Sequence, residues 1–448
     1  MRRVIALGAI VLLGLGLTAL LVFKPWKVEV ESPRFVDRLP MDDIIGRTNV
    51  LNLSRDLIPV TYSNQISFRE FISPEFILSQ GKINGLNLQR PIYFFGNQTK
   101  GEIERWGVMV HVSDSSKLYP GIKRFEKITE LKDSSSFDQR VFIFPEYDLA
   151  VGYGKDWLLL SDRKSFKKYF DNVYNARIKS IYPRWRQFIE EKLYADKSLQ
   201  MSVISKELRS YGVKSALLAS SSDSLSLTLH TRITNVDTIP FTLKESGDRF
   251  EQIEFTRRLI NLHLNIDRLK EDTNHHLYLL LKKTANKISF PLAEFLETWN
   301  GDITFRQGGL QTIVEPYVVS ELDENFNITE VVKYKEKKIS GFALQMSMGD
   351  TRPEFIRKLY SKGILTREEN KVRMLYFPPM KAQMEEESVS FYTSSFQPET
   401  VMDSTQSVLW DFNYTPVLFT VDSLQSKVAY GKINIGLKKF LKDKLKQE

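Results

Sequence analysis

Cysteine is absent from the 448 residues of this chain. Its absence excludes disulfide bonds, thiol catalysis and zinc sites built on cysteine. A lipid attached to cysteine is excluded as well. The composition is consistent with an oxidising compartment, where stray thiols are hazardous.

Histidine is scarce, with five residues scattered along the chain. His275 and His276 are adjacent, so their side chains diverge around a helix and do not converge on a metal. His263 falls on the polar face of a predicted strand. The sequence contains no glycine-rich phosphate loop, H-E-x-x-H or G-x-S-x-G motif. We therefore assign no catalytic, cofactor-binding or metal-ligating residue and expect no cofactor.

A concentrated positive charge is also lacking. The net charge of +8 falls to +6 without Arg2 and Arg3 and is spread over the chain, which does not indicate a nucleic-acid partner. Apolar residues make up 42% and aromatic residues 12% of the sequence, which is enough for a substantial core. The length predicts two or three domains.

One long uncharged run, Val4–Phe23, stands between Arg2–Arg3 and Lys24. About twenty apolar residues span a hydrocarbon core, so the run predicts an uncleaved signal anchor. A cleaved signal peptide and a buried soluble helix are the alternatives. The positive residues before the run favour a cytoplasmic N-terminus and an extracytoplasmic body, periplasmic in a bacterium.

Two segments of the remaining chain show the same order of predicted strands and helices. Leu51, Leu53 and Asp56 match Leu262, Leu264 and Asp267 at a spacing of 211 residues. Later pairs match at 234 or 233 residues, so the second segment contains an insertion at about 309–338, which predicts a hairpin. Chance similarity between two α/β segments is the alternative explanation.

The predicted fold class is α+β: one transmembrane helix, then two related, mostly antiparallel sheet domains with helices on one face, produced by internal duplication. We expect residues 108–112 to superpose on 342–346, and 141–144 on 374–377. The domain boundaries follow from this: residues 1–23 for the N-terminus and anchor, 24–47 for a proline-containing spacer, 48–258 for the first repeat, and 259–448 for the second repeat with the inserted hairpin 309–338, C-terminal strands and a basic helix.

Motifs with possible chemistry have simpler explanations. Ser161/Lys164 and Ser165/Lys168 have the spacing of serine–lysine hydrolases, but they also fit a helix start with a solvated face. Asp323, Asn325 and Asn327 resemble the first ligands of a calcium loop, yet Ile328 stands where the loop needs glycine. A polar hairpin tip explains these residues better.

Two basic segments could contact a membrane or glycans. Residues 179–188 alternate arginine with Tyr182, Trp185 and Phe188, and an amphipathic helix with its aromatic side chains packed inward explains them better than a membrane or glycan contact. Residues 437–446 form a basic amphipathic pattern, typical of a helix on a membrane surface or of a helix that caps a domain.

Two short stretches, Leu39–Asp43 before the first predicted strand and Trp299–Ile303 at the end of a predicted helix, resemble uncharacterised bacterial families of membrane- or lipid-anchored extracytoplasmic proteins. Those families have no established activity, so the resemblance implies no functional residues. The missing cysteine separates this chain from the lipid-anchored members.

The leading hypothesis is a membrane-tethered, non-enzymatic binding or scaffold protein of the cell envelope. The alternatives are a carrier of an apolar or lipid ligand, which predicts a large lipophilic cavity, and a hydrolase with dispersed catalytic residues. Expected partners are the lipid bilayer, through the N-terminal helix, and an envelope protein or an apolar ligand.

Overall fold

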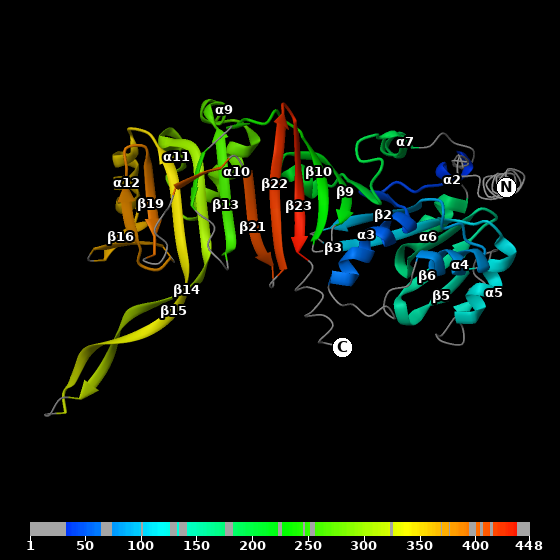
Figure 1. The fold of residues 1–448 in the computed structure, drawn as a ribbon, viewed down its shortest axis with the longest axis horizontal. Coiled ribbons are helices and arrows are strands. Elements are labelled where there is room, and N and C mark those ends of the chain that lie inside the picture. Colours follow the sequence, from blue (N-terminus) through cyan, green and yellow to red (C-terminus); the bar gives the residue numbers. More distant parts are fainter. Residues whose placement is uncertain are drawn as a thin grey trace, which may run out of the picture. The chain divides into compact units, whose positions relative to one another are not determined.

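The protein is described here by a computed structural model. The described residues are 33–63, 74–99, 102–125, 132–133, 141–174, 182–222, 226–244, 247–250, 256–322, 326–368, 370–375, 377–393, 400–403, 406–412 and 415–436. The chain divides into two compact units (Figure 1). Unit 1 contains Met1–Met41, Ile77–Phe94 and Arg105–Glu190, and unit 2 contains Asp42–Phe76, Phe95–Glu104 and Glu191–Glu448.

The division between the units falls within two strands, β2 (Ile92–Thr99) and β3 (Glu102–His111), and within one helix, α4 (Pro74–Ile83). The other elements of unit 1 are α2 (Pro33–Val36), α5 (Ser115–Phe125), β4 (Lys132–Asp133), β5 (Val141–Phe144), η1 (Pro145–Tyr147), β6 (Leu149–Tyr153), β7 (Trp157–Asp162), α6 (Arg163–Tyr174) and α7 (Pro183–Glu190).

The sheet of unit 1 is antiparallel, with β3 beside β7, β7 beside β6 and β6 beside β5. Helix α6 buries its aromatic side chains against this sheet. A Cβ atom at Gly152 would lie 2.5 Å from the Phe170 ring and 2.9 Å from the Phe166 ring. Glycine at this position on β6 therefore permits the helix to approach the sheet closely.

Helix α7 is held to the N-terminal part of unit 1 by Trp185. This side chain is fully buried, and its Nε1 donates a hydrogen bond to the Pro40 carbonyl oxygen at 2.8 Å. Phe188 is buried one turn later, whereas Arg186 and Tyr182 are exposed. The aromatic side chains of the 179–188 segment that lie on the helix therefore pack inward.

Unit 2 contains most of the strands and a group of helices. Its elements are β1 (Ile44–Thr48), α3 (Val50–Ser63), β8 (Leu199–Val203), α8 (Lys206–Ser210), β9 (Val213–Ser222), β10 (Ser226–Asn235), β11 (Thr242–Leu243), β12 (Gly247–Phe250), β13 (Thr256–Asn265), α9 (Asp267–Glu271), α10 (His276–Lys287), α11 (Leu292–Thr298), β14 (Trp299–Leu322), β15 (Ile328–Met348), α12 (Arg352–Ser361), β16 (Leu365–Glu368), β17 (Lys371–Met374), β18 (Lys381–Met384), β19 (Ser388–Tyr392), β20 (Thr400–Asp403), β21 (Gln406–Phe412), β22 (Thr415–Gln425) and β23 (Val428–Gly436).

The central strands of unit 2 pair in the order β1-β8-β9-β10-β23-β22-β21-β13-β14-β15-β19-β18, each pair antiparallel. On either side of the β10–β23 pair, three consecutive strands form a meander whose first strand pairs with an earlier strand of the chain. That earlier strand is β1 on one side and β13 on the other.

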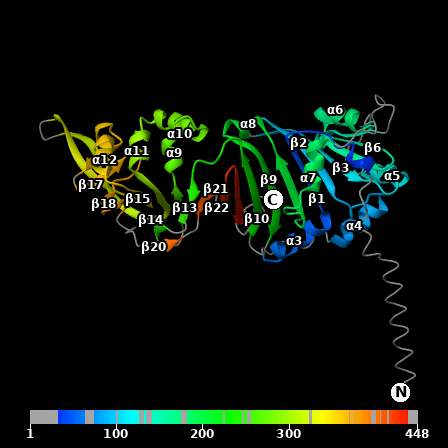
Figure 2. The same cartoon turned by 90° about the horizontal axis from the view of Figure 1, so that it is seen from above.

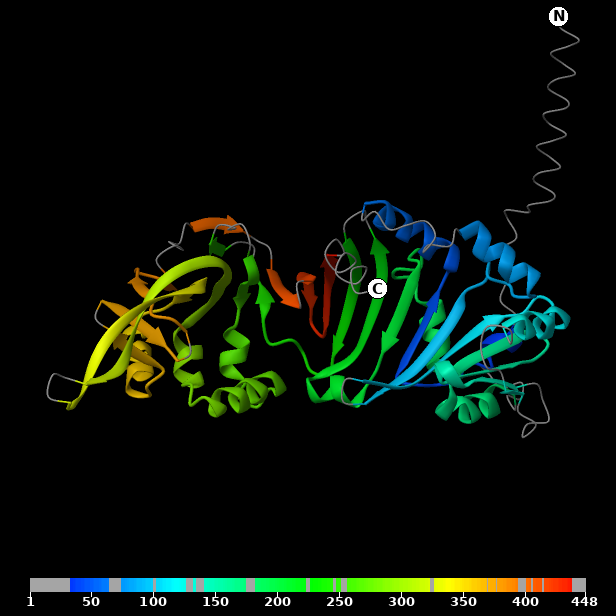
Figure 3. The same cartoon turned by 90° about the horizontal axis from the view of Figure 1, so that it is seen from below.

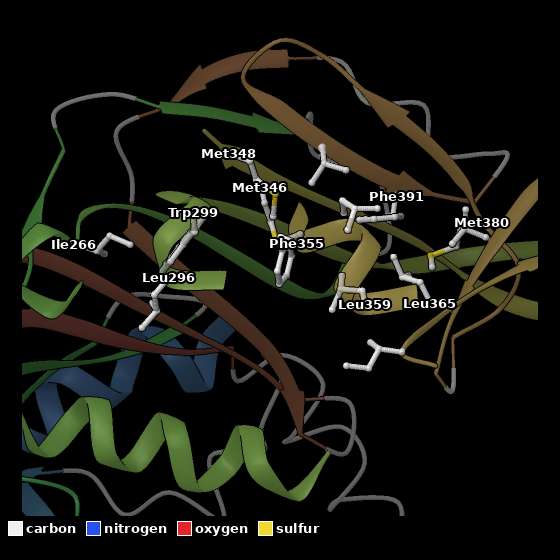
Figure 4. Close-up of a cluster of buried hydrophobic side chains, with 14 of the residues drawn as sticks. Ile266, Leu296, Trp299, Met346, Met348, Phe355, Leu359, Leu365, Met380 and Phe391 are labelled. Carbon is white, nitrogen blue, oxygen red and sulfur yellow. The ribbon is translucent and has the colours of Figure 1, made fainter. Parts of the chain in front are cut away.

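Helices α9 to α12 lie on one face of the sheet around β13–β15, and β20 lies on the other face (Figures 2 and 3). Their buried side chains form the main core of unit 2, where Leu296, Phe355 and Leu359 of the helices meet Met346 and Phe391 of the sheet (Figure 4). The helices thus bury the apolar face that strand alternation produces.

The predicted fold class is wrong. The described residues are mostly antiparallel strands, and pairing links 19 of them into one large sheet, in place of two separate α+β sheet domains. The predicted copies 48–258 and 259–448 share a sheet because β10 and β23 pair from Ser226 opposite Gly436 to Thr234 opposite Val428. An open strand edge leaves backbone N–H and C=O groups unpaired. Pairing of β10 with β23 satisfies these groups on the facing edges of both strands.

The predicted transmembrane helix and signal anchor do not appear in the part of the chain that the structure describes. Among the described residues, no helix combines the length and the apolar character needed to cross a membrane. The Val4–Phe23 run itself lies outside the described residues, as does the predicted basic helix 437–446.

The residue correspondence proposed for the duplication fails at its start. Leu51 and Leu53 lie in helix α3, whereas Leu262 and Leu264 lie in strand β13. Asn49 explains the difference, because its side-chain oxygen accepts a hydrogen bond from the Asn52 N–H at 3.1 Å and caps the helix. The strand in this region is β1, which precedes Asn49.

The correspondence fails again at residues 374–377. Strand β17 ends at Met374, and Leu375 adopts a left-handed backbone conformation with a φ of 42°. Phe377 therefore leaves the strand, and its ring packs 4.5 Å from that of Phe342. Residues 108–112 and 342–346, by contrast, lie mainly or wholly in the strands β3 and β15.

Candidate ligand-binding cavity

Unit 2 contains a cavity of about 380 Å³, partly open to solvent, beside the N-terminus of α10. Most of the side chains that line it are apolar: Val213, Ile233, Ile239, Pro240, Phe241, Leu243, Leu262, Leu264, Leu277, Val421, Leu424 and Ala429. The polar or glycine residues of the lining are Tyr211, Gly212, Asn235, Asp237, Thr238, His275, His276 and Gln406.

Alternation along β13 assigns the two faces of this strand to different environments. Leu262 and Leu264 line the cavity, and Leu264 is also paired with Leu243 of the short strand β11. Asn261 precedes Leu262, and His263 stands between the two leucines. Both polar residues are fully buried and belong to the opposite face. One strand therefore supplies an apolar cavity wall and a buried polar network.

Backbone hydrogen bonds fix the segment 235–239, which forms one side of the cavity. The Asn235 N–H donates to the Lys427 carbonyl at 2.7 Å, and the Ile239 N–H donates to the Ser426 carbonyl at 2.7 Å. The Val236 N–H donates to the Gly212 carbonyl at 2.8 Å. These bonds tie the segment to two neighbouring turns, so this wall is formed without a ligand.

His275 joins the same segment to helix α10. Its Nδ1 accepts a hydrogen bond from the Leu277 N–H at 3.1 Å and caps the helix. Its Nε2 lies 2.9 Å from the Thr238 carbonyl oxygen. Because a carbonyl only accepts, the proton belongs on Nε2, and this neutral tautomer satisfies both contacts.

Gly212 allows His276 to approach the cavity. The φ of Gly212 is +78°, and a Cβ atom there would lie 3.1 Å from the His276 Nδ1. A side chain at position 212 would therefore strain the backbone and press on the imidazole. Both adjacent histidines line the cavity, from the first residues of one helix.

The polar network behind β13 centres on His263. Its Nδ1 lies 3.1 Å from Asp302 Oδ1, its Nε2 lies 3.2 Å from Asn261 Oδ1, and its backbone N–H donates to Gln406 Oε1 at 2.6 Å. Asp302 also accepts a hydrogen bond from Lys244 Nζ at 2.8 Å. The sequence placed His263 on a polar strand face, but this face is buried.

The ionisation of Asp302 is set by competing effects. Burial raises the pKa of Asp302, but hydrogen bonds from His263, Lys244 and Ser347 outweigh it and hold the pKa below the ordinary value of 3.8. The carboxylate therefore stays charged and anchors a network that joins β13, β14 and residue 244. Since both ring nitrogens of His263 are engaged and its side chain is 0% exposed, this pair has a structural role.

The serine–lysine pairs are not brought together. Ser161 is fully buried in β7 and donates to the Asp162 carbonyl, while Lys164 is exposed. Ser165 is buried at the start of α6, where its N–H donates to Asp162 Oδ1, and Lys168 points to solvent. These residues form a helix start with a solvated face.

Asp323 and Asn325, two of the three calcium-like residues, are outside the described residues, and Asn327 directly precedes β15. Across the part of the chain that the structure describes, no group of three or more histidine, aspartate or glutamate side chains is placed to hold a metal.

Sequence reasoning missed the cavity. The residues that line it come from β9, β10, β11, β13, α10, β21, β22 and β23 and from the connecting segments 211–212 and 237–241, which are spread over more than two hundred positions. The one local signal was the His275–His276 pair just before an apolar helical stripe, which marks a helix start. Nothing in their spacing indicates that both face a cavity.

No family model and no curated protein matches this chain. Among solved structures, the chain is similar to crystal form I of TP0453, with a TM-score of 0.30, 8% identity, and coverage of 47% of this chain and 81% of that one. Crystal form IV gives a TM-score of 0.30 at 7% identity, covering 47% and 83%, and crystal form III gives 0.31 at 6% identity, covering 46% and 80%. A likeness at this level carries no inference about ligand or activity.

Proposed function

We propose that this protein binds a small apolar or amphipathic molecule in the cavity of unit 2 and acts as a carrier for it. The observation that supports the proposal is the apolar lining of a cavity of about 380 Å³. Ligand pockets are typically of about 300–1,000 Å³, mostly apolar, with a few polar groups that fix orientation.

The energetic argument is the removal of apolar surface from water. Burial contributes roughly 25 cal/mol per Å² of apolar surface, so an alkyl or ring-containing ligand gains several kcal/mol inside the lining. The polar side chains of Asn235, Asp237 and His276 supply hydrogen-bonding groups at the same cavity. They favour a ligand with an apolar body and one polar end.

The other hypotheses have less support. A hydrolase needs an accessible nucleophile and base, whereas the His263 side chain is fully buried and the serine–lysine pairs diverge. The extracytoplasmic location and the resemblance to envelope protein families stay predictions.

The test is binding of a fluorescent fatty acid, cis-parinaric acid, to the full chain. Ala429 lines the cavity, whereas its neighbour Val428 is not part of the lining and points to the other face of β23. We expect Ala429→Phe to weaken binding at least tenfold, a loss of about 1.4 kcal/mol, because the ring occupies the cavity. Val428→Phe, as the matched control, should bind within about twofold of wild type.

Two results would overturn the proposal. One is unchanged binding by Ala429→Phe in a variant that keeps the wild-type circular dichroism spectrum. The other is a failure of the wild-type protein to bind cis-parinaric acid and to retain any apolar molecule detectable by mass spectrometry of an organic extract.

A further inference from the structure

A long two-stranded extension leaves the sheet of unit 2. The segment Gly309–Lys338, here called the arm, comprises the distal part of β14 and the proximal part of β15. Figure 1 shows both strands continuing together beyond the ends of the neighbouring strands. The register between them shifts between Gly308 and Gln311, and Gly309 has a φ of +62°, so the arm begins at a bulge.

One face of the arm is apolar and exposed. Val318 pairs with Val332, and Leu322 pairs with Ile328, so these side chains share a face. They are 60%, 53%, 63% and 75% exposed, and Tyr334 on the same face is 70% exposed. A two-stranded hairpin is marginally stable by itself, and its exposed apolar face is typical of an association surface.

The opposite face of the arm is occupied by its own polar contacts. Lys333 forms an ion pair with Glu321, and the Lys335 ammonium lies 5.5 Å from the centre of the Tyr317 ring. This face is thereby satisfied within the arm. The apolar face is the one that gains from a partner.

The charges of the arm are separated along its length. Residues 315–330 contain five acidic and no basic residues, whereas residues 331–338 contain four lysines and one glutamate. On the apolar face itself the charged residues are Glu330, Glu336 and Lys338, whereas Lys333, Lys335 and Lys337 lie on the opposite face. Two arms laid antiparallel by their apolar faces can place Glu330 of each beside Lys338 of the other. At these positions the arm is electrostatically complementary to a second copy of itself.

We propose that the arms of two copies of this chain pair antiparallel through their apolar faces, about a twofold axis near Tyr334. In this register, Glu330 of each copy faces Lys338 of the other, and both residues lie on the apolar face and are exposed. An isologous contact of this kind closes as a dimer. Glu330 and Glu336 on this face disfavour an anionic membrane as the occupant.

The absence of native cysteine permits a specific cross-linking test in the full chain. Tyr334→Cys places a thiol at the proposed axis, and Lys333→Cys places a thiol on the opposite face as the matched control. With a short bismaleimide, we expect Tyr334→Cys to give a covalent dimer on denaturing electrophoresis and Lys333→Cys to remain monomeric. Equal cross-linking of the two variants would overturn the proposed face.

A charge exchange tests the register independently. In sedimentation equilibrium, Glu330→Lys or Lys338→Glu alone should weaken the dimer roughly five- to tenfold, because each creates two like-charge contacts. The double variant should recover wild-type association to within about twofold. A monomeric wild-type protein at all concentrations overturns the proposal, and so does a double variant weaker than either single one.

Lipid is the competing occupant. A polarity-sensitive fluorophore on Tyr334→Cys should respond to protein concentration and not to added phosphatidylcholine vesicles. A response to the vesicles by a monomeric protein would assign the face to a membrane and overturn the dimer.

Discussion

The Nε2 of His275 lies 2.9 Å from the carbonyl oxygen of Thr238, so one imidazole joins the start of helix α10 to the segment 235–239 that forms one side of the cavity. The same ring caps the helix through Nδ1. Helix capping and cavity shape therefore depend on one side chain in its neutral form.

His275→Asn separates these two contacts. Asparagine is a strong N-cap residue but too short to replace the imidazole at Thr238, so we expect the helix cap to remain while cis-parinaric acid binding weakens. His275→Ala removes both contacts and should also lower the free energy of unfolding by about 1 kcal/mol. Urea titration and fluorescence binding measure the two effects. Equal loss of stability in both variants would contradict this division.

Gly212→Ala should disturb the cavity as well as the backbone. A non-glycine residue in the left-handed region costs about 1–2 kcal/mol, and here the added Cβ also meets His276 Nδ1 at 3.1 Å. Gly363 offers a matched control, because its φ is +67° and nothing lies within 4 Å of a Cβ there. We expect both variants to lose stability in urea titration and only Gly212→Ala to lose ligand affinity. Weakened binding by Gly363→Ala would show that backbone strain alone is responsible.

Asp302 should contribute to stability in a pH-dependent way. Because its folded pKa is held below 3.8, its contribution is present above the unfolded pKa and is lost as the pH falls through the folded pKa. Asp302→Asn should therefore be less stable than wild type at pH 6, and the difference should shrink below about pH 3.8. Urea titrations across this range measure it. A difference that grows on acidification would contradict the sign.

Trp185→Phe tests the hydrogen bond that holds helix α7 to the Pro40 carbonyl in unit 1. The substitution removes the indole N–H and leaves the buried Pro40 carbonyl without this donor, so we expect a loss of about 1–3 kcal/mol in the free energy of unfolding. Tyr182→Phe, at a 49% exposed position, is the control and should change stability by less than about 0.5 kcal/mol. Intrinsic fluorescence of the remaining tryptophans follows the transition in both variants.

The spacing of apolar residues predicted much of the secondary structure. Alternation identified the strands around Leu262–Leu264 and Phe342–Met346, and the apolar spacing of Trp185 and Phe188 identified a helix with inward aromatic side chains. The match between Leu51–Leu53 and the strand residues Leu262–Leu264 failed because one polar contact starts a helix at the first of these segments. The Asn49 cap turned the Leu51–Leu53 alternation into the first turn of a helix.

The candidate cavity could not be predicted from the spacing of residues in the sequence. Leu264, Ala429 and His275 are each unremarkable in sequence, since the first two read as ordinary strand residues and the third as a helix start. Their shared cavity depends on strand pairing between segments far apart in the chain. Periodicity is a local property, and it does not specify which strands become neighbours.

By itself, the sequence determined which chemistries are excluded, because the absence of cysteine rules out thiol and disulfide chemistry in any fold. It also determined which segments alternate and that residues 309–338 have the pattern of a hairpin. Tertiary structure alone decided that β10 and β23 pair to make one sheet, and that His263 is buried while its neighbour Leu264 faces a cavity. The physical reason is that backbone pairing satisfies whichever strand edges meet, and burial then assigns each side chain its environment.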